Sequence, residues 1–176
     1  MTAEPHLSET ALVEEATKKS GLVWVSGPGA APETRALWHV WVDGAAHLLG
    51  DGPGEQPLPA GLGDGATAVV TVRSKDKGGR LLAWTARVTA LEPHGEAWET
   101  AVAELKGKRL NAPDAETMTD RWARECRVLR LDPVSADTRP PEGSLAAPPL
   151  PTEATTRRPV PDALPRLLFR RRKRDS

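Results

Sequence analysis

Residues 35–50 read RALWHVWVDGAAHLLG, and this stretch decides the fold. Large apolar side chains occupy both alternating faces of the run 37–42, so an extended strand here has no face suited to water. Asp43-Gly44 follows, and both residues of such a turn need a positive φ, which makes the pair a strong hairpin signal. Because both strand faces need cover, the stretch predicts a barrel wall or a contact between two copies of the chain.

The length and cysteine content limit the class of protein. The chain has 176 residues, which fits one domain with an appendage. Its single cysteine, Cys126, cannot form an internal disulfide, which favours a reducing compartment. The first ten residues contain no basic segment of the signal-peptide type, and no apolar run is long enough to span a membrane. We therefore expect a cytoplasmic protein.

The zero net charge is the sum of two parts of the chain with opposite charge. Residues 1–132 carry 15 Lys/Arg against 19 Asp/Glu, whereas residues 133–176 carry 9 against 5 together with nine of the 17 prolines. The second part has too little apolar character to offset the entropy of ordering, so we expect a disordered tail there and a folded domain over residues 1–132. The acidic balance of the folded part argues against nucleic-acid binding by the core.

A basic cluster ends the chain. Five cations at positions 170–174 follow Leu167, Leu168 and Phe169. Two interpretations stay open for this cluster: a solvated tail, or a contact with anionic lipid or nucleic acid.

Helical signals occur in three segments. Residues 8–19 suit a helix that Ser8 caps and Gly21 follows. Residues 95–109 place apolar side chains on one helical stripe, namely Ala97, Trp98, Ala101, Val102 and Leu105. Residues 114–125 suit a second short helix, with Asp114 as its cap.

Strand signals fill most of the remaining domain. We expect a strand at 22–25, the hairpin around Asp43-Gly44, a second hairpin formed by 66–75 and 80–92, and a last strand at 126–133 that Pro133 stops. Residues 51–65 are rich in glycine and proline and show no strand pattern. A loop of this length is uncommon inside a domain, and it suits either an active-site lid or a mobile surface loop.

In this order the elements resemble the pyridoxamine 5′-phosphate oxidase-like family, the FMN-binding split barrels, over about residues 8–132. The resemblance is carried by RALWHVWVDGAAHLL, by ATAVVTVRSKDKGGRLLAWTARVTALEP and by the closing RWARECRVLRLDP. It implies a mainly antiparallel split β-barrel with a few peripheral helices, and a homodimer.

The resemblance also implies a function. Members of this family bind FMN, or in some branches a deazaflavin or haem, between two barrels, and the cofactor carries a redox reaction on a small molecule. Carried onto this chain, the cofactor phosphate contact is Arg35. The family's cationic phosphate loop is replaced by GPGEQPLPAGL, which offers Glu55 and no cation, so Arg73, Lys75 and Arg80 are candidate substitutes.

Several alternatives stay open. His39 suits a packed histidine in the barrel wall, and the alternative is a place under a flavin ring or on haem iron. The run 73–80 suits a phosphate cradle or a wet hairpin tip. The sequence indicates no catalytic residue, and its scattered histidines predict no metal site. A split barrel that has lost flavin and serves as a binding or structural module is the second functional hypothesis.

Overall fold

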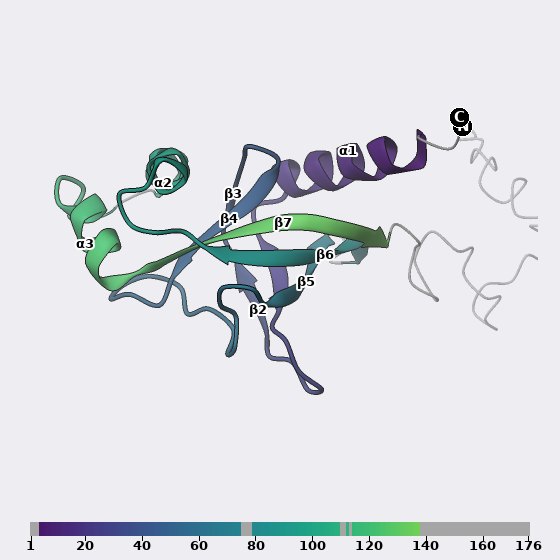
Figure 1. The fold of residues 1–176 in the computed structure, drawn as a ribbon, viewed down its shortest axis with the longest axis horizontal. Helices are drawn as coiled ribbons and strands as arrows, with labels where there is room; N and C mark the ends of the chain where they lie inside the picture. The colour runs from purple at the N-terminus through teal and green to yellow at the C-terminus, as the bar shows by residue number, and fades with distance from the viewer. Residues whose placement is uncertain (1–3, 75–78, 110–111, 113, 138–176) are drawn as a thin grey trace, which may run out of the picture. The chain divides into compact units, whose positions relative to one another are not determined.

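The computed structural model describes residues 4–74, 79–109, 112 and 114–137 (Figure 1). Within these residues the chain forms ten elements in the order α1 (Glu4–Lys19), β1 (Val23–Ser26), β2 (Thr34–Leu37), β3 (Val40–Val42), β4 (Ala45–Gly50), β5 (Thr67–Arg73), β6 (Arg80–Ala90), α2 (Glu96–Lys108), α3 (Met118–Glu125) and β7 (Arg127–Asp137). The predicted strands and both predicted hairpins are present. The predicted fold class is therefore confirmed.

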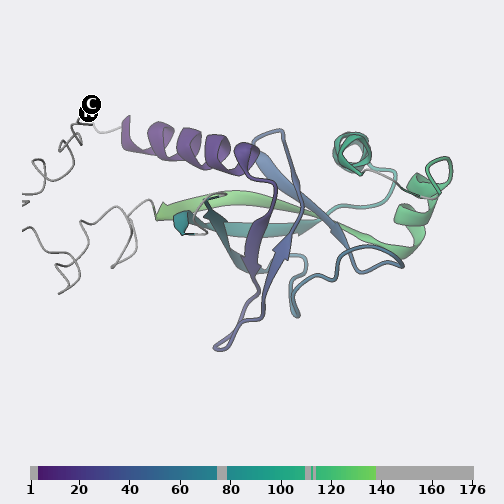
Figure 2. The ribbon, with the colours of Figure 1, turned by 180° about the vertical axis from the view of Figure 1, so that it is seen from behind.

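The described strands form one antiparallel sheet in the order β2-β1-β5-β6-β7-β4-β3. The strands at the two ends of this order, β2 and β3, are consecutive in the chain and are separated only by Trp38 and His39. Three peptide units span at most about 11 Å, so the sheet has to curl until its two edges approach each other. The curled sheet in Figures 1 and 2 is the split barrel that the sequence predicts.

The tight turn at Asp43-Gly44 forms as predicted. The φ angles of Asp43 and Gly44 are 49° and 71°, and the turn joins β3 directly to β4. Val42 pairs with Ala45 beside the turn, and Val40 pairs with His47 farther along. The two left-handed residues match the twist of the hairpin, which explains why aspartate and glycine stand there.

The strand predicted over residues 37–42 is interrupted, although its alternation survives. Trp38 and His39 belong to neither β2 nor β3. Leu37 and Trp41 nevertheless pack in the barrel interior, whereas Trp38 and Val40 pack in a second cluster on the other side of the sheet. Both faces of the stretch are thus covered within one chain.

At this interruption the side chain of Gln56 takes the place of the backbone hydrogen bonds that a continuous strand would make. Its Oε1 accepts the Trp38 N–H at 2.9 Å, and its Nε2 donates to the carbonyls of Trp38 and Leu49, each also at 2.9 Å. A carboxamide offers the same donor and acceptor as a peptide group. Gln56 therefore bridges the edge of the barrel to β4 where the backbone ladder stops.

Two hydrophobic clusters stabilise the fold. The barrel interior contains, among others, Val23, Val25, Leu48, Val70, Trp84 and Leu129. The second cluster contains, among others, Leu49, Trp98, Leu105, Trp122 and Val128. Helix α2 packs on β3, β4 and β7, while α1 packs on β3, β6 and β7. The two ribbon views show α1 beside one half of β7 and both α2 and α3 beside the other half.

Two predicted helix starts are wrong. Helix α1 begins at Glu4, so Ser8 lies inside it and is not its cap; Pro5 suits the first turn, where its missing N–H has no helical partner to lose. Helix α3 begins at Met118, with Thr117 in the N-cap position. Asp114 instead opens the preceding turn, where its carbonyl accepts the Thr117 N–H at 2.9 Å.

The apolar stripe of α2 is confirmed except at one residue. Trp98, Ala101, Val102 and Leu105 are buried, whereas Ala97 is exposed. At 100° per residue, Ala97 lies about a quarter turn away from the centre of the other four.

The predicted end of the last strand at Pro133 is wrong, because β7 continues to Asp137. Ala86 faces Pro133 and Thr85 faces Ser135, so Val134 is an extra residue in a bulge. Proline lacks an N–H and is tolerated where a bulge interrupts the ladder. The rest of the predicted tail, with its basic cluster, lies outside the described residues. No helix in the described part of the chain combines the length and the apolar character that a membrane crossing requires.

Candidate functional site

Two of the predicted cofactor contacts lie together at the end of the second hairpin. Arg73 of β5 and Arg80 of β6 face each other in the ladder, and just beyond them the Ser74 N–H donates to the Gly79 carbonyl at 2.8 Å. Lys75 falls outside the described residues. The sequence distance between Arg73 and Arg80 is short because a hairpin joins them, so the pattern RSKDKGGR correctly places both cations at one site.

Arg73 and Arg80 have different neighbours. The Arg73 guanidinium lies over the ring of Trp24, 4.8 Å from its centroid. Such stacking uses the flat face of the guanidinium and leaves its N–H edge open to an anion. Arg80 lies 3.5 Å from the carboxylate of Asp137. Arg80 thus has a carboxylate neighbour, whereas Arg73 is held against an aromatic ring.

A groove adjoins Arg73. It has a volume of about 430 Å³ and lies between α1 and the end of the hairpin, with apolar walls from Ala16, Val72 and Leu81. Leu81 is 54% exposed, which is unusual for a leucine in a strand. An apolar groove with a cation at its rim suits a ligand that has a flat apolar part and an anionic group.

Arg35 does not join this cluster. It pairs in the sheet with Val25, which in turn pairs with Val70, so Arg35 belongs to the row that faces the barrel interior. Trp24 and Arg73 belong to the opposite face. The guanidinium of Arg35 forms an ion pair with Glu33, whose other oxygen accepts the Ala60 N–H at 2.9 Å. These two contacts, the backbone hydrogen bond first, lower the pKa of Glu33 and keep it charged beside Arg35.

His39 is enclosed rather than open to a ligand. Its side chain is fully buried, and Nε2 donates to the Thr17 carbonyl of α1 at 2.9 Å. Burial lowers the pKa of His39 to about 4, so the ring is neutral at pH 7. Lys108 of α2 donates to the His39 carbonyl at 2.8 Å. His39 therefore connects both helices to the corner between β2 and β3, as a wall histidine does.

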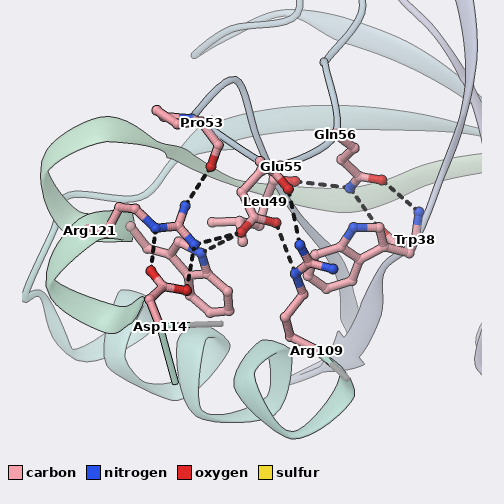
Figure 3. Close-up of polar contacts among 10 residues, drawn as sticks. Trp38, Leu49, Pro53, Glu55, Gln56, Arg109, Asp114 and Arg121 are labelled. Carbon is pink, nitrogen blue, oxygen red and sulfur yellow. Dashed lines mark hydrogen bonds and ion pairs between the residues drawn. The ribbon is translucent and has the colours of Figure 1, made fainter. Parts of the chain in front are cut away.

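The loop between β4 and β5 holds an ion cluster that sequence reasoning did not predict (Figure 3). The Glu55 side chain is fully buried, and Oε1 accepts both the Trp122 Nε1–H at 3.0 Å and an Arg121 N–H at 3.1 Å. Arg109 lies 3.3 Å from Oε2. Three donors from the end of α2 and from α3 thus converge on one carboxylate.

The same loop is fastened at its other end. Asp51 has a positive φ of 65°, and its carboxylate accepts the Leu58 N–H at 2.8 Å and the Arg127 Nε–H at 2.9 Å. Leu58 and Leu62 are buried in the barrel interior. In the sequence, these two leucines are the feature from which packing of this stretch on the core could have been predicted. No neighbouring residue indicates that Glu55 is a buried ion-pair partner. The structure therefore favours neither a free surface loop nor an open lid.

Two further reactive side chains are screened by burial. His47 is 1% exposed, and burial together with Arg130 lowers its pKa to about 4. Cys126 is partly buried, and burial raises the pKa of its thiol to about 11, so the thiol is protonated at pH 7. Among the residues that the structure describes, no three histidine, cysteine or acidic side chains are placed to hold a metal ion.

No protein-family model matches the sequence, and no curated protein matches it either. Solved structures do match. A conserved hypothetical protein from Mycobacterium tuberculosis aligns with a TM-score of 0.52 at 12% identity, covering 86% of this chain and 92% of that one. A putative general stress family protein from Xanthomonas campestris aligns with a TM-score of 0.50 at 18% identity, covering 86% of this chain and 99% of that one.

A putative pyridoxamine 5′-phosphate oxidase from Listeria innocua aligns with a TM-score of 0.48 at 12% identity, covering 73% of this chain and 95% of that one. At these identities the likeness concerns the fold. The chain has the split-barrel fold that the sequence resemblance implied.

Proposed function

We propose that this split-barrel chain binds FMN or a deazaflavin and supports a redox reaction on a small molecule. The observation that carries the proposal is Arg73, which lies at the rim of an apolar groove, stacks on Trp24 and faces Arg80 across the β5–β6 ladder. When bound, a flavin supplies the hydride transfer, and the protein supplies binding, orientation and exclusion of water.

The residues at this groove fit such a cofactor. Arg73 and Arg80 offer several charge-assisted donors to a phosphate, and Lys75 follows two positions after Arg73 in the sequence. Leu81, which is 54% exposed, offers apolar surface to a flat ring. Arg35 is less suited than the sequence implied, because it belongs to the other face of the sheet and is already neutralised by Glu33.

The test is a titration of flavin fluorescence with matched arginine variants. A charge-assisted hydrogen bond contributes roughly 1.5–3 kcal/mol, so we expect Arg73→Ala and Arg80→Ala each to weaken FMN binding by about one to two decades. Arg35→Ala is the matched control and should change the affinity far less. A larger loss in Arg35→Ala than in Arg73→Ala would move the phosphate site to the other face of the sheet.

We propose further that the working form is a homodimer in the cytoplasm. The face of the sheet that carries Trp24 and Arg73 also exposes Val69, which is 44% exposed. In the family that this chain resembles, the cofactor lies between two barrels, so the rim at Arg73 would be completed by a second copy. Light scattering tests this directly, and a monomer at micromolar concentration would count against a shared cofactor groove.

A second function has one specific observation in its favour. The stretch GPGEQPLPAGL, residues 52–62, stands where similar proteins have a cationic loop; it contains no cation, and its carboxylate, Glu55, is turned inward. This favours a split barrel that has lost flavin and acts as a binding or structural module. An absorption spectrum of the purified protein separates the two functions: flavin bands support the first, a Soret band indicates haem, and no chromophore with no FMN binding supports the second.

A further inference from the structure

The buried carboxylate of Glu55 occupies a cradle with the composition of an anion site. Arg109 lies at the end of α2, and Arg121 and Trp122 are consecutive residues of α3. Arg121 and Trp122 donate to Glu55 Oε1, and Arg109 Nε lies 3.3 Å from Oε2 (Figure 3). Two guanidinium groups and an indole N–H are donors only. Such a set requires an anionic or strongly accepting partner, which the loop supplies from a position more than 50 residues away in the sequence.

The carboxylate fits this cradle incompletely. Oε1 of Glu55 receives two hydrogen bonds, whereas the buried Oε2 receives none, although Arg109 Nε lies 3.3 Å away. Arg109 Nε is itself buried without a hydrogen bond. A carboxylate has two oxygens fixed in one plane, so it cannot align with all three donors together. A tetrahedral oxyanion has more oxygens in more directions and can.

Charge also favours an oxyanion once Glu55 is removed. Asp114 accepts Arg121 Nε–H at 2.6 Å and compensates that guanidinium. Two other arginine N–H groups donate to loop carbonyls, Arg121 to Pro53 at 2.8 Å and Arg109 to Gly54 at 3.0 Å. Without Glu55 the cradle retains one uncompensated positive charge.

We propose that Arg109, Arg121 and Trp122 form a binding site for a phosphate-type oxyanion, which the chain closes with its own Glu55 carboxylate. The loop from Asp51 to Leu58 and an external oxyanion therefore compete for the same donors. Arg109 and Arg121 are 31% and 19% exposed, so the cradle lies near the surface beneath the loop. The site is separate from the groove at Arg73 and does not depend on flavin binding.

The test uses inorganic phosphate and the variant Glu55→Ala, at constant ionic strength. Thermal unfolding should show the variant gaining stability with phosphate in a saturable manner, with the ratio of folded to unfolded protein rising about tenfold at ten times the dissociation constant. Sulfate should act similarly and chloride should not. A folded Glu55→Ala that shows no saturable response to phosphate overturns the site.

Two controls isolate the cradle. Glu55→Gln still fills the space and still accepts from Trp122, so it should respond to phosphate far less than Glu55→Ala. Asp132→Ala frees Arg130, which lies 2.9 Å from Asp132, a carboxylate that is 41% exposed where Glu55 is buried, and it should not create a saturable response. An equal response in Asp132→Ala would mean that any released arginine suffices, which also overturns the proposal.

Hydrogen exchange in the unaltered protein tests the competition without a mutation. The Glu55 N–H donates to the Gly52 carbonyl and the Leu58 N–H donates to Asp51, so both amides report closure of the loop. Phosphate should accelerate exchange at both amides and leave amides of β5 unchanged. Unchanged exchange at Glu55 and Leu58 at high phosphate would show that the loop does not yield to an external oxyanion.

Discussion

His39 and His47 are enclosed in their neutral form, and each therefore makes stability depend on pH. Their folded-state pKa values are both about 4, against an ordinary value of 6.5. Above pH 6.5 both rings are neutral whether the chain is folded or not. As the pH falls from 6.5 towards 4, only the unfolded chain binds the protons, so stability is lost through this window.

We expect the free energy of unfolding to fall by about 1.4 kcal/mol per pH unit for each of these histidines between pH 6.5 and 4. Urea unfolding at pH 7, 6 and 5 measures the slope. His47→Gln should reduce that slope by the contribution of one histidine, because one proton fewer is taken up on unfolding, and His39→Gln should do the same. Slopes that stay equal to that of the unaltered protein would show that neither ring is buried neutral.

Glu55 is a third buried ionisable residue, after His39 and His47, whose replacement should have a measurable effect on stability. Removing one partner of a buried ion pair leaves the other charge uncompensated, which costs about 3–5 kcal/mol. We expect Glu55→Gln to fall in the lower part of that range, because its amide oxygen still accepts from Trp122. Asp132→Asn breaks the more exposed pair with Arg130 and should cost at most about 1 kcal/mol. Chemical denaturation of both variants tests the difference, which equal losses would contradict.

The sequence predicts residues well where their role is local and poorly where it is not. Arg73 and Arg80 were placed together because one hairpin joins them. From the sequence, Glu55 stood out only because it lies in a stretch without cations where similar proteins have them. Its role as a buried ion-pair partner could not be predicted, because Arg109, Arg121 and Trp122 are more than 50 positions away. Arg35 was assigned by resemblance alone, and no local pattern reveals that Glu33 neutralises it on the inner face of the sheet.

At the scale of elements, the interruption at Trp38 and His39 depends on one side chain. Gln56 makes three hydrogen bonds there, to both backbone groups of Trp38 and to the Leu49 carbonyl. Water can replace Gln56 at these three backbone groups only to a small extent, because Leu49 is fully buried and Trp38 is partly buried. This explains why an irregular loop can close a regular sheet.

We expect Gln56→Ala to lower the free energy of unfolding by about 2–4 kcal/mol, since it leaves three backbone groups without their partner. Gln56→Glu is the matched comparison, because it keeps the acceptor for Trp38 N–H and loses both donated bonds. Hydrogen exchange at the Trp38 amide should accelerate strongly in Gln56→Ala and less in Gln56→Glu. An unchanged Trp38 amide in Gln56→Ala would mean that water replaces the side chain without loss.

Element types followed from periodicity, but element ends did not. The run 37–42 alternates as a strand should, yet nothing in it indicates a break after Leu37, because the break serves the closure of the whole sheet. Judged from its neighbours in the sequence, Pro133 should end the strand. In the structure a bulge opposite Thr85 and Ala86 accommodates the proline, and β7 continues beyond it. Such ends are set by partners across the sheet rather than by neighbours along the chain.

At the scale of the whole molecule, the extent of β7 defines where the chain can be shortened. Residues 135–137 pair with Ala83, Trp84 and Thr85 of β6, and Asp137 also approaches Arg80. Truncation after Asp137 should therefore leave the melting temperature nearly unchanged, whereas truncation after Val134 should lower it by several degrees. Thermal unfolding of the two truncated chains tests this, and equal melting temperatures would show that the end of β7 adds no stability.

The closed order of the sheet also determines when folding can finish. The hairpins β3–β4 and β5–β6 join neighbouring segments and can form within microseconds. The ladder between β4 and β7 instead pairs Ala46 with Leu131 and Gly50 with Arg127, which brings together distant parts of the chain. Closing so long a segment is entropically costly and slow, typically on a scale of milliseconds to seconds. Until β7 is docked, β4 and β6 each keep an open edge, so the last of the described strands to be synthesised is also the one that protects the barrel from pairing with other chains.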